Sequence, residues 1–183
     1  MSDSRPWFRE PETFIALAAL VVSLSAVAVG IYEASLQRTH DRAEVWPHVE
    51  LATYTTPKSA TLTLENTGIG PAVVGSIVVS VDGTARRNWP DALEALFGAL
   101  PKTYSVTTMG DRAMRPGEKT VIVEVPADQL PPGFWQYIGR VGVSICYASV
   151  FGEHWTMSVP KLGGKPTWTP NSGCPPQRDS TDF

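Results

Sequence analysis

The clearest pattern in the chain is a run of uncharged, mostly apolar residues near its N-terminus, 13–32 (TFIALAALVVSLSAVAVGIY). Leu, Val, Ala and Ile occupy every face of the helix that this run would form, so no polar stripe is left for a soluble surface. At a rise of 1.5 Å per residue, the helix would be about 30 Å long, the thickness of a bilayer's hydrocarbon core. The pattern predicts a transmembrane helix over residues 13–32.

This apolar run has two other interpretations, a buried helix of a globular domain and a cleaved signal peptide. The triplet Ala26-Val27-Ala28 is similar to a signal-peptide cleavage site. However, the run is longer than the roughly 7–15 residues of a signal-peptide core and continues beyond this triplet. Residues 1–12 also contain more acidic than basic side chains, unlike a basic leader. We therefore expect an uncleaved anchor, preceded by a short cytoplasmic N-terminus over residues 1–12.

The helix is expected to continue beyond the membrane. Residues 33–44 are mostly polar and contain no Gly or Pro, which favours a short helical stalk. Pro47 prevents further helix, so the folded domain is expected to begin at residue 45. Ala26, Gly30 and Ala34 form a row of small side chains that would allow two membrane helices to pack closely. These three residues are candidate helix-packing positions.

Residues 45–160 change to short β-rich runs separated by turn signals. The run 60–65 (ATLTLE) alternates Leu with Thr, which is the period of a half-buried strand. Apolar positions in 91–100 instead follow helical spacing and predict one short helix. About seven strands over this length are typical of an immunoglobulin-like antiparallel β-sandwich, so we expect a mainly β fold of that class. The predicted strands are 48–54, 60–65, 72–81, 103–108, 119–125, 140–151 and 154–159.

Two segments show no strand or helix pattern. Residues 126–139 are rich in Pro and are predicted to connect two strands. Residues 161–183 contain four further prolines and are predicted to form an irregular C-terminal tail.

Composition argues against several function classes. The formal net charge is −3 and the pI is about 5.6, so nothing attracts the chain to nucleic acid as a whole. The histidines, His40, His48 and His154, are scattered and have no ligand partners at metal-site spacing. No motif for a catalytic nucleophile, a phosphate loop or a dinucleotide fold is complete. We expect a non-enzymatic protein with no catalytic, cofactor or metal site.

The two cysteines allow two interpretations, a pair of free buried thiols or one disulfide. Cys146 lies in the last long predicted strand, and Cys174 lies in the tail. The polar context NSGCPP places Cys174 at the surface, where a free thiol is a liability, and this favours a bridge. A Cys146–Cys174 disulfide would require an oxidising compartment.

Two aromatic clusters are candidate sites for a protein partner. Trp, Tyr and Arg dominate the energetics of protein interfaces. The alternative is that these rings only close the open ends of the sandwich. The candidate residues are Arg86, Arg87, Trp89, Phe134, Trp135 and Tyr137.

The orientation of the anchor is not decided by flanking charge, because Arg5 and Arg9 precede the span and Arg38 and Arg42 follow it. A short polar N-terminus before an apolar anchor is similar to an uncleaved signal, which leaves the N-terminus inside and exports the following domain. Export would also allow the cysteines to pair. We therefore expect the domain outside the cytoplasm.

The anchor and stalk, the corner LENTGIGPAVV (64–74), the turn RPGE (115–118) and the hairpin ICYASVFGEHW (145–155) occur together in this order. Over about residues 10–160, this arrangement resembles a group of uncharacterised bacterial single-pass membrane proteins with an immunoglobulin-like domain outside the cytoplasm. The resemblance implies a bacterial inner-membrane protein with a periplasmic domain, and it implies no activity or site residues.

Together these expectations describe a membrane-anchored β-sandwich that binds a protein partner, or a second copy of itself, in a bacterial envelope complex. The alternative is a structural accessory subunit of a membrane assembly, in which the helix over residues 13–32 makes the main contact.

Overall fold

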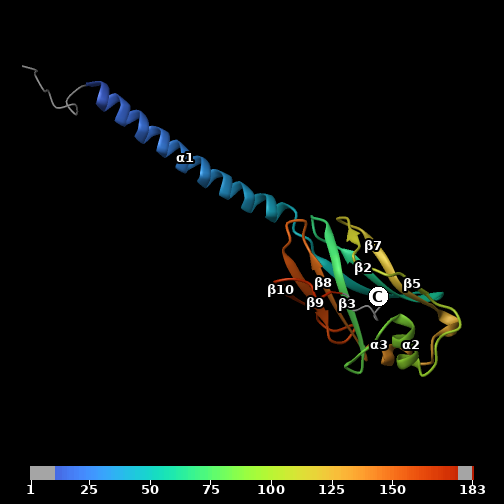
Figure 1. The fold of residues 1–183 in the computed structure, drawn as a ribbon. Helices are drawn as coiled ribbons and strands as arrows, with labels where there is room; N and C mark the ends of the chain where they lie inside the picture. The colour runs from blue at the N-terminus through green and yellow to red at the C-terminus, as the bar shows by residue number, and fades with distance from the viewer. Residues whose placement is uncertain (1–10, 177–182) are drawn as a thin grey trace, which may run out of the picture. The chain divides into compact units, whose positions relative to one another are not determined.

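The computed structural model describes residues 11–176 and Phe183. It divides into an N-terminal helical unit and a β-rich unit that begins at Glu44 (Figure 1). Residues 1–10, most of the predicted cytoplasmic segment, lie outside the described residues.

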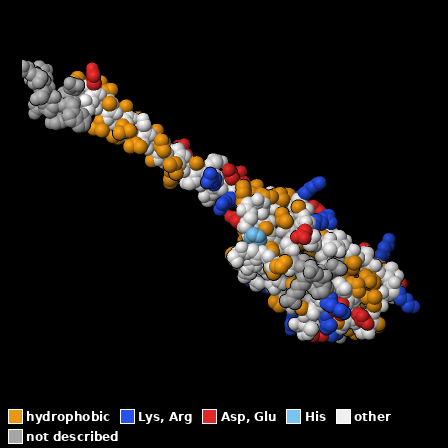
Figure 2. All heavy atoms as spheres, in the orientation of Figure 1, with side chains coloured by type: hydrophobic (Ala, Val, Ile, Leu, Met, Phe, Trp, Pro, Cys, Tyr) orange, Lys and Arg blue, Asp and Glu red, His pale blue; other side chains and the backbone are white. Residues whose placement is uncertain are grey.

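The N-terminal unit is one continuous helix, α1 (Pro11–Glu44). It contains both the predicted membrane segment and the predicted stalk, and it is long and apolar enough to span a membrane. Apolar side chains follow one another along the visible face of its N-terminal part (Figure 2), and the leucine, isoleucine and valine side chains from Ile15 to Ile31 are more than half exposed. The Ser23 hydroxyl donates a hydrogen bond to the Ala19 carbonyl at 2.7 Å, which satisfies a polar group within the apolar run.

The β-rich unit contains two antiparallel sheets, as expected from the strand pattern. The first sheet has the order β1-β2-β7-β5, and the second has the order β10-β9-β8-β3-β4, with β6 paired to the start of β3. The strands of the first sheet are β1 (Val49–Thr55), β2 (Ser59–Asn66), β7 (Lys119–Pro126) and β5 (Ser105–Val106). Those of the second are β10 (Thr167–Asn171), β9 (His154–Val159), β8 (Val141–Ala148), β3 (Ala72–Val81), β4 (Thr84–Ala85) and β6 (Ala113–Met114).

The hydrophobic core lies between these two sheets. Leu62 and Leu64 of β2 face it, as their alternation predicts, and are at most 7% exposed. Ile77 and Val79 of β3 and Tyr147 of β8 contribute from the opposite sheet. Each fully buried side chain of this size stabilises the fold by roughly 1.5–3 kcal/mol.

The unit has more helix than the single one predicted. Helix α2 (Trp89–Phe97) corresponds to the predicted helix but begins two residues earlier, because the Asn88 side chain caps it by accepting from the Asp91 N–H at 2.9 Å. It ends at Gly98, whose φ of 82° is left-handed. A 3-10 turn, η2 (Ala127–Gln129), and a second helix, α3 (Phe134–Ile138), occupy the predicted Pro-rich connection. Five residues are too few to give a helical period in the sequence.

The prediction of an irregular tail over residues 161–183 was wrong at Thr167–Asn171, which form a strand, and residues 177–182 of that tail lie outside the described residues. Strand β10 pairs with β9, from Thr167 opposite Ser158 to Asn171 opposite His154. Pro170 lies in this strand because β10 is at the edge of its sheet, where a missing N–H need not interrupt a ladder. Predicted strand 103–108 is shortened to β5, and the last long strand ends at Ala148.

Candidate binding surface

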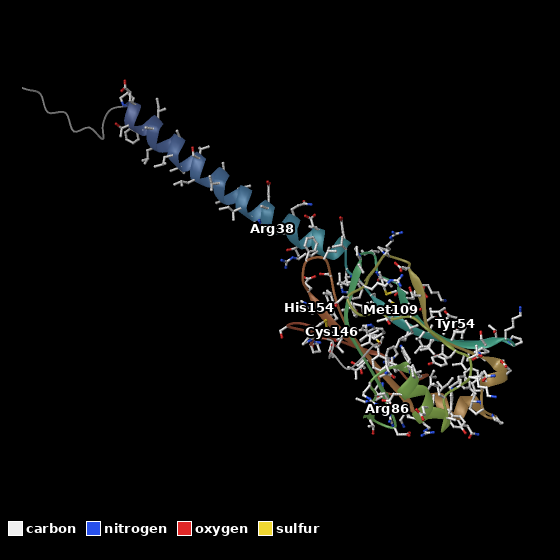
Figure 3. The ribbon with its side chains drawn as sticks, turned by 45° about the vertical axis from the view of Figure 1, so that its right-hand side comes forward. Arg38, Tyr54, Arg86, Met109, Cys146 and His154 are labelled. Atoms are coloured by element: carbon white, nitrogen blue, oxygen red, sulfur yellow. A yellow bond between two sulfur atoms is a disulfide. The ribbon has the colours of Figure 1, made fainter. Side chains whose placement is uncertain are left out.

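The predicted disulfide between Cys146 and Cys174 is present, and it closes a sequence separation of 28 residues. Cys146, labelled in Figure 3, lies on β8 between Ile145 and Tyr147. Because these two neighbours face the core, alternation along the strand places the Cys146 side chain on the outer face of the sheet. A Cβ added at Gly75 would lie 2.8 Å from the Cys174 Cβ. Gly75, at a register shift in the pairing of β3 with β8, therefore leaves room for the tail to cross this face.

Trp89 was predicted as a candidate for binding a protein partner, but its side chain is not available to one. It is 4% exposed and packs edge-to-face against Phe183, with ring centroids 5.4 Å apart. Arg86 and Arg87 lie beside it and both face Asp91, at N–O distances of 4.0 and 3.8 Å. Asp91 also accepts from the Arg87 backbone N–H at 3.1 Å. Arg86 and Arg87 therefore contact the first turn of α2, and the Arg87 side chain remains 76% exposed.

The three candidate aromatic residues of helix α3 have two different roles. Phe134 and Tyr137 are half-buried and pack against Phe97 of α2, with ring centroids 6.2 and 6.1 Å apart. They close the end of the sandwich, as the alternative interpretation expected. Trp135 is 64% exposed and is the member of this group that can contact a partner.

Trp135 lines a cleft of about 470 Å³, which we call the β1 cleft. One side of the cleft is formed by β1 and the other by the loop that follows β9, with α3 between them. None of the residues that line the cleft has a titratable side chain. The side chains that line it include those of Leu51, Thr53, Trp135, Ile138, Val159 and Leu162. An apolar hollow of about 70 Å³ adjoins the cleft and shares Thr53, Ile138 and Leu162 with it.

Sequence reasoning did not identify the β1 cleft. Leu51 and Thr53 are ordinary strand residues, and Leu162 lies in the segment predicted as an irregular tail. These residues come together because β1, at the edge of the first sheet, lies near the loop that follows β9 of the second sheet. Trp135 was the part of this surface that composition could identify.

The corner motif LENTGIGP has a structural role centred on Asn66. Its buried amide donates to the carbonyls of Gly70, Met114 and Arg115, at 2.8, 3.2 and 3.3 Å. Its Oδ1 accepts from two backbone N–H groups, those of His48 and Gly68. The motif thus joins the start of β1 to the turn before β7.

Two carboxylates of the domain, Asp82 and Glu118, are held at turns by hydrogen bonds from arginine residues. Arg140 donates to Asp82 at 2.9 Å, and this hydrogen bond lowers the pKa of the Asp82 carboxyl. The Arg115 backbone N–H donates to Glu118 at 2.9 Å and lowers the pKa of that carboxyl. Asp82 thus stabilises the turn between β3 and β4, and Glu118 stabilises the RPGE turn (115–118).

Two groups near β1, the Tyr147 hydroxyl and the Lys119 ammonium, also have shifted pKa values. Burial raises the pKa of the Tyr147 hydroxyl, and the adjacent backbone of Val49 opposes this shift. Lys119 donates to the Tyr54 hydroxyl at 2.7 Å, and this hydrogen bond raises the pKa of the lysine.

His48 packs between Trp46 and Trp168, with ring centroids 5.0 and 4.5 Å away. No group of three or more potential metal ligands occurs within residues 11–176 or at Phe183.

The candidate helix-packing row, Ala26, Gly30 and Ala34, lies on α1 and is exposed along the helix. A Cβ added at Gly30 would meet no described atom within 4 Å. A larger residue at this position is therefore compatible with the helix itself, which makes Gly30 a suitable position for testing helix packing.

The sequence matches no known protein family, and no curated protein sequence is significantly similar to it. The geometry of the domain and the apolar character of α1 are therefore the observations from which function is inferred.

Proposed function

We propose that this chain is a single-pass protein of the bacterial inner membrane, whose periplasmic β-sandwich binds a protein partner and has no enzymatic activity. The observation that carries this proposal is Trp135, which is 64% exposed beside the β1 cleft. A large exposed aromatic side chain next to a hollow is typical of a protein-binding surface. The absence of titratable side chains from the cleft lining favours binding over acid–base chemistry.

The strand order supports an immunoglobulin-like assignment. In that fold, one sheet has the order A-B-E-D and the other contains C, F and G. Assigning A to β1, B to β2, C to β3, D to β5, E to β7, F to β8 and G to β9 reproduces both orders. Here β10 extends the second sheet beyond β9. Domains of this class commonly act as binding modules, and this agrees with the resemblance noted in the sequence.

The disulfide supports a location outside the cytoplasm. Structural disulfides form and persist in oxidising compartments, including the bacterial periplasm. The Cys146–Cys174 bond belongs to a domain that directly follows α1, a helix able to span a membrane. An anchor with its N-terminus inside would place the domain in the periplasm.

Crosslinking in native membranes, followed by purification of the full-length chain, tests the binding function. The wild-type chain is expected to retain a partner that Trp135→Ala loses. Trp46→Ala, which removes another exposed tryptophan outside the β1 cleft, should retain it. Loss of the partner from Gly30→Ile but not from Trp135→Ala would instead support the alternative, a structural subunit held through α1. Recovery of no partner by the wild-type chain would contradict both.

A further inference from the structure

Strand β1 is an edge strand, and the direction of its backbone groups can be determined residue by residue. The His48 carbonyl accepts from the Thr67 N–H at 2.7 Å, so His48 faces β2. In an antiparallel pair, this direction alternates along the strand. Val49, Leu51 and Thr53 therefore direct their N–H and C=O groups away from β2. The Val49 carbonyl, which accepts from the Trp168 indole N–H at 3.0 Å, agrees with this assignment.

The free backbone groups of Leu51 and Thr53 are at the β1 cleft. Both residues line it, and their outward N–H and C=O groups make no hydrogen bond to the part of the chain that the structure describes. The Trp168 indole occupies the outward carbonyl of Val49. An edge strand with free donors and acceptors is a template for one more strand.

The far side of the cleft is formed by the loop after β9, which we call the wall loop (161–166). Gly163 has a left-handed φ of 83°, and Gly164 lies so close to the Lys161 carbonyl that an added Cβ would be 2.8 Å from it. The wall loop therefore turns sharply at glycines, which project no side chains into the cleft. The adjacent residues Val159 and Leu162, with Ile138 of α3, supply apolar surface.

The wall loop also contributes positive charge. Lys161 and Lys165 are exposed, and no acidic residue occurs between Pro160 and Asn171. The cleft lining itself is uncharged. An occupant would therefore gain from apolar side chains in its centre and acidic residues at its ends.

We propose that the β1 cleft binds an extended peptide segment of a partner protein, which adds to the first sheet as a strand alongside Leu51 and Thr53. The segment has apolar side chains at alternate positions and acidic flanks. This inference rests on the proposed binding function and names the chemistry of the partner. Strand addition of this kind gains affinity from main-chain hydrogen bonds and specificity from alternate side chains.

A lone peptide strand fits this geometry better than a second copy of the chain. A second β1 would bring its own β2 on its far side, and the wall loop already lies across the cleft from β1. A partner segment with no sheet behind it has no such conflict.

Binding of a synthetic peptide to the full-length protein in detergent micelles tests the proposal. The probe is fluorescein-labelled Asp-Val-Thr-Val-Thr-Val-Asp, followed by fluorescence anisotropy. Leu51→Pro should raise its Kd about tenfold, because proline removes an N–H that faces the cleft and not β2. Trp135→Ala should also weaken binding several-fold, whereas Trp46→Ala should leave the Kd unchanged. Thermal melting of each variant checks that the domain remains folded.

Two modified peptides test the main-chain contacts without changing the protein. One is N-methylated at its valines and the other at its threonines. Because alternate N–H groups of a strand point to opposite sides, one of the two should lose binding and the other should retain it. Equal binding by both, or no binding of the unmodified peptide up to millimolar concentration, would overturn the proposal.

Amide hydrogen exchange gives a readout that depends on no variant. Saturation with the peptide should slow exchange at Leu51 and Thr53 and leave Glu50 and Ala52, which already face β2, unchanged. Binding without this alternation would refute strand addition. Slow exchange at Leu51 in the peptide-free protein, together with dimers that dissociate on dilution, would show that a second copy fills the cleft and would also overturn the proposal.

The outcome separates this inference from the proposed function. If Leu51→Pro and Trp135→Ala still capture the natural partner from membranes, the domain is a binding module whose contact lies elsewhere. If the wild-type chain captures no partner but binds the peptide with alternating protection, the cleft is a strand-binding site and the proposed envelope complex is wrong.

Discussion

Removing the disulfide with Cys174→Ala should substantially destabilise the domain. The bond closes a sequence separation of 28 residues, and the chain-entropy relation then gives about 3.6 kcal/mol at 25 °C. The domain begins at Glu44 and has about 140 residues, for which an unfolding entropy of roughly 2.1 cal/mol/K per residue applies. The melting temperature should therefore fall by about 12 °C. Differential scanning calorimetry of the full-length chain in detergent, with and without reductant, measures this change.

Gly75→Ala provides a second test of the same region. Its new Cβ would lie 2.8 Å from the Cys174 Cβ and 3.0 Å from its Sγ, so the bridged tail must shift. In the Cys174→Ala background, the Sγ is absent and the tail is free to move. Gly75→Ala should thus destabilise the wild type more than it destabilises the Cys174→Ala variant. Equal costs in both backgrounds, or a change in melting temperature below about 3 °C for Cys174→Ala, would refute this account of the tail.

Three other properties of the chain can be tested directly. Asn66→Ala, which removes five hydrogen bonds from a buried amide, should lower the free energy of unfolding by about 3 kcal/mol in urea titrations. The pKa of the Asp82 carboxyl is lower in the folded protein than its unfolded value of 3.8. The stability that this difference contributes is therefore present above pH 3.8 and is lost as the pH falls through the folded pKa. The urea midpoint should decline over this pH range, and Asp82→Asn should make the decline smaller. Protease added to spheroplasts should digest the domain, and alkylation without reductant should label neither Cys146 nor Cys174; a protected domain with two reactive thiols would contradict a periplasmic location.

The elements that show a clear hydrophobic pattern within their own segment could be predicted from the sequence. The uncharged run of α1 and the alternation of Leu62 and Leu64 each follow directly from one helix or one strand. The disulfide was also predictable, because the polar context of Cys174 is unusual for a free thiol. These signals do not depend on how the sheets pack.

Trp89 was misassigned although the sequence contains a signal for its position. Asn88 before Trp-Pro is a helix start, with the proline in the first turn. A helix beginning at Trp89 places that ring on the same face as Leu93 and Leu96, four and seven residues later, and all three are buried. Starting the helix at Asp91 concealed this relation.

The tail and the β1 cleft depend on contacts between distant segments. The alternation in Thr167-Trp168-Thr169 is short and is flanked by prolines, so only its pairing with β9 makes it a strand. Leu51 and Leu162 are more than a hundred residues apart and form one surface through sheet topology alone. No window of the sequence contains both sides of this site.

The late position of Cys174 has a consequence for the synthesis of the protein. Cys146 is made 28 residues before its partner, which at 5–20 residues per second corresponds to about 1–6 seconds. Strand β10 and Phe183, which packs on Trp89, also come from the last part of the chain. A nascent chain therefore presents Cys146 as an unpaired thiol on an incomplete sheet throughout this interval. The second sheet and its disulfide can therefore be completed only after residues 167–174 have been made.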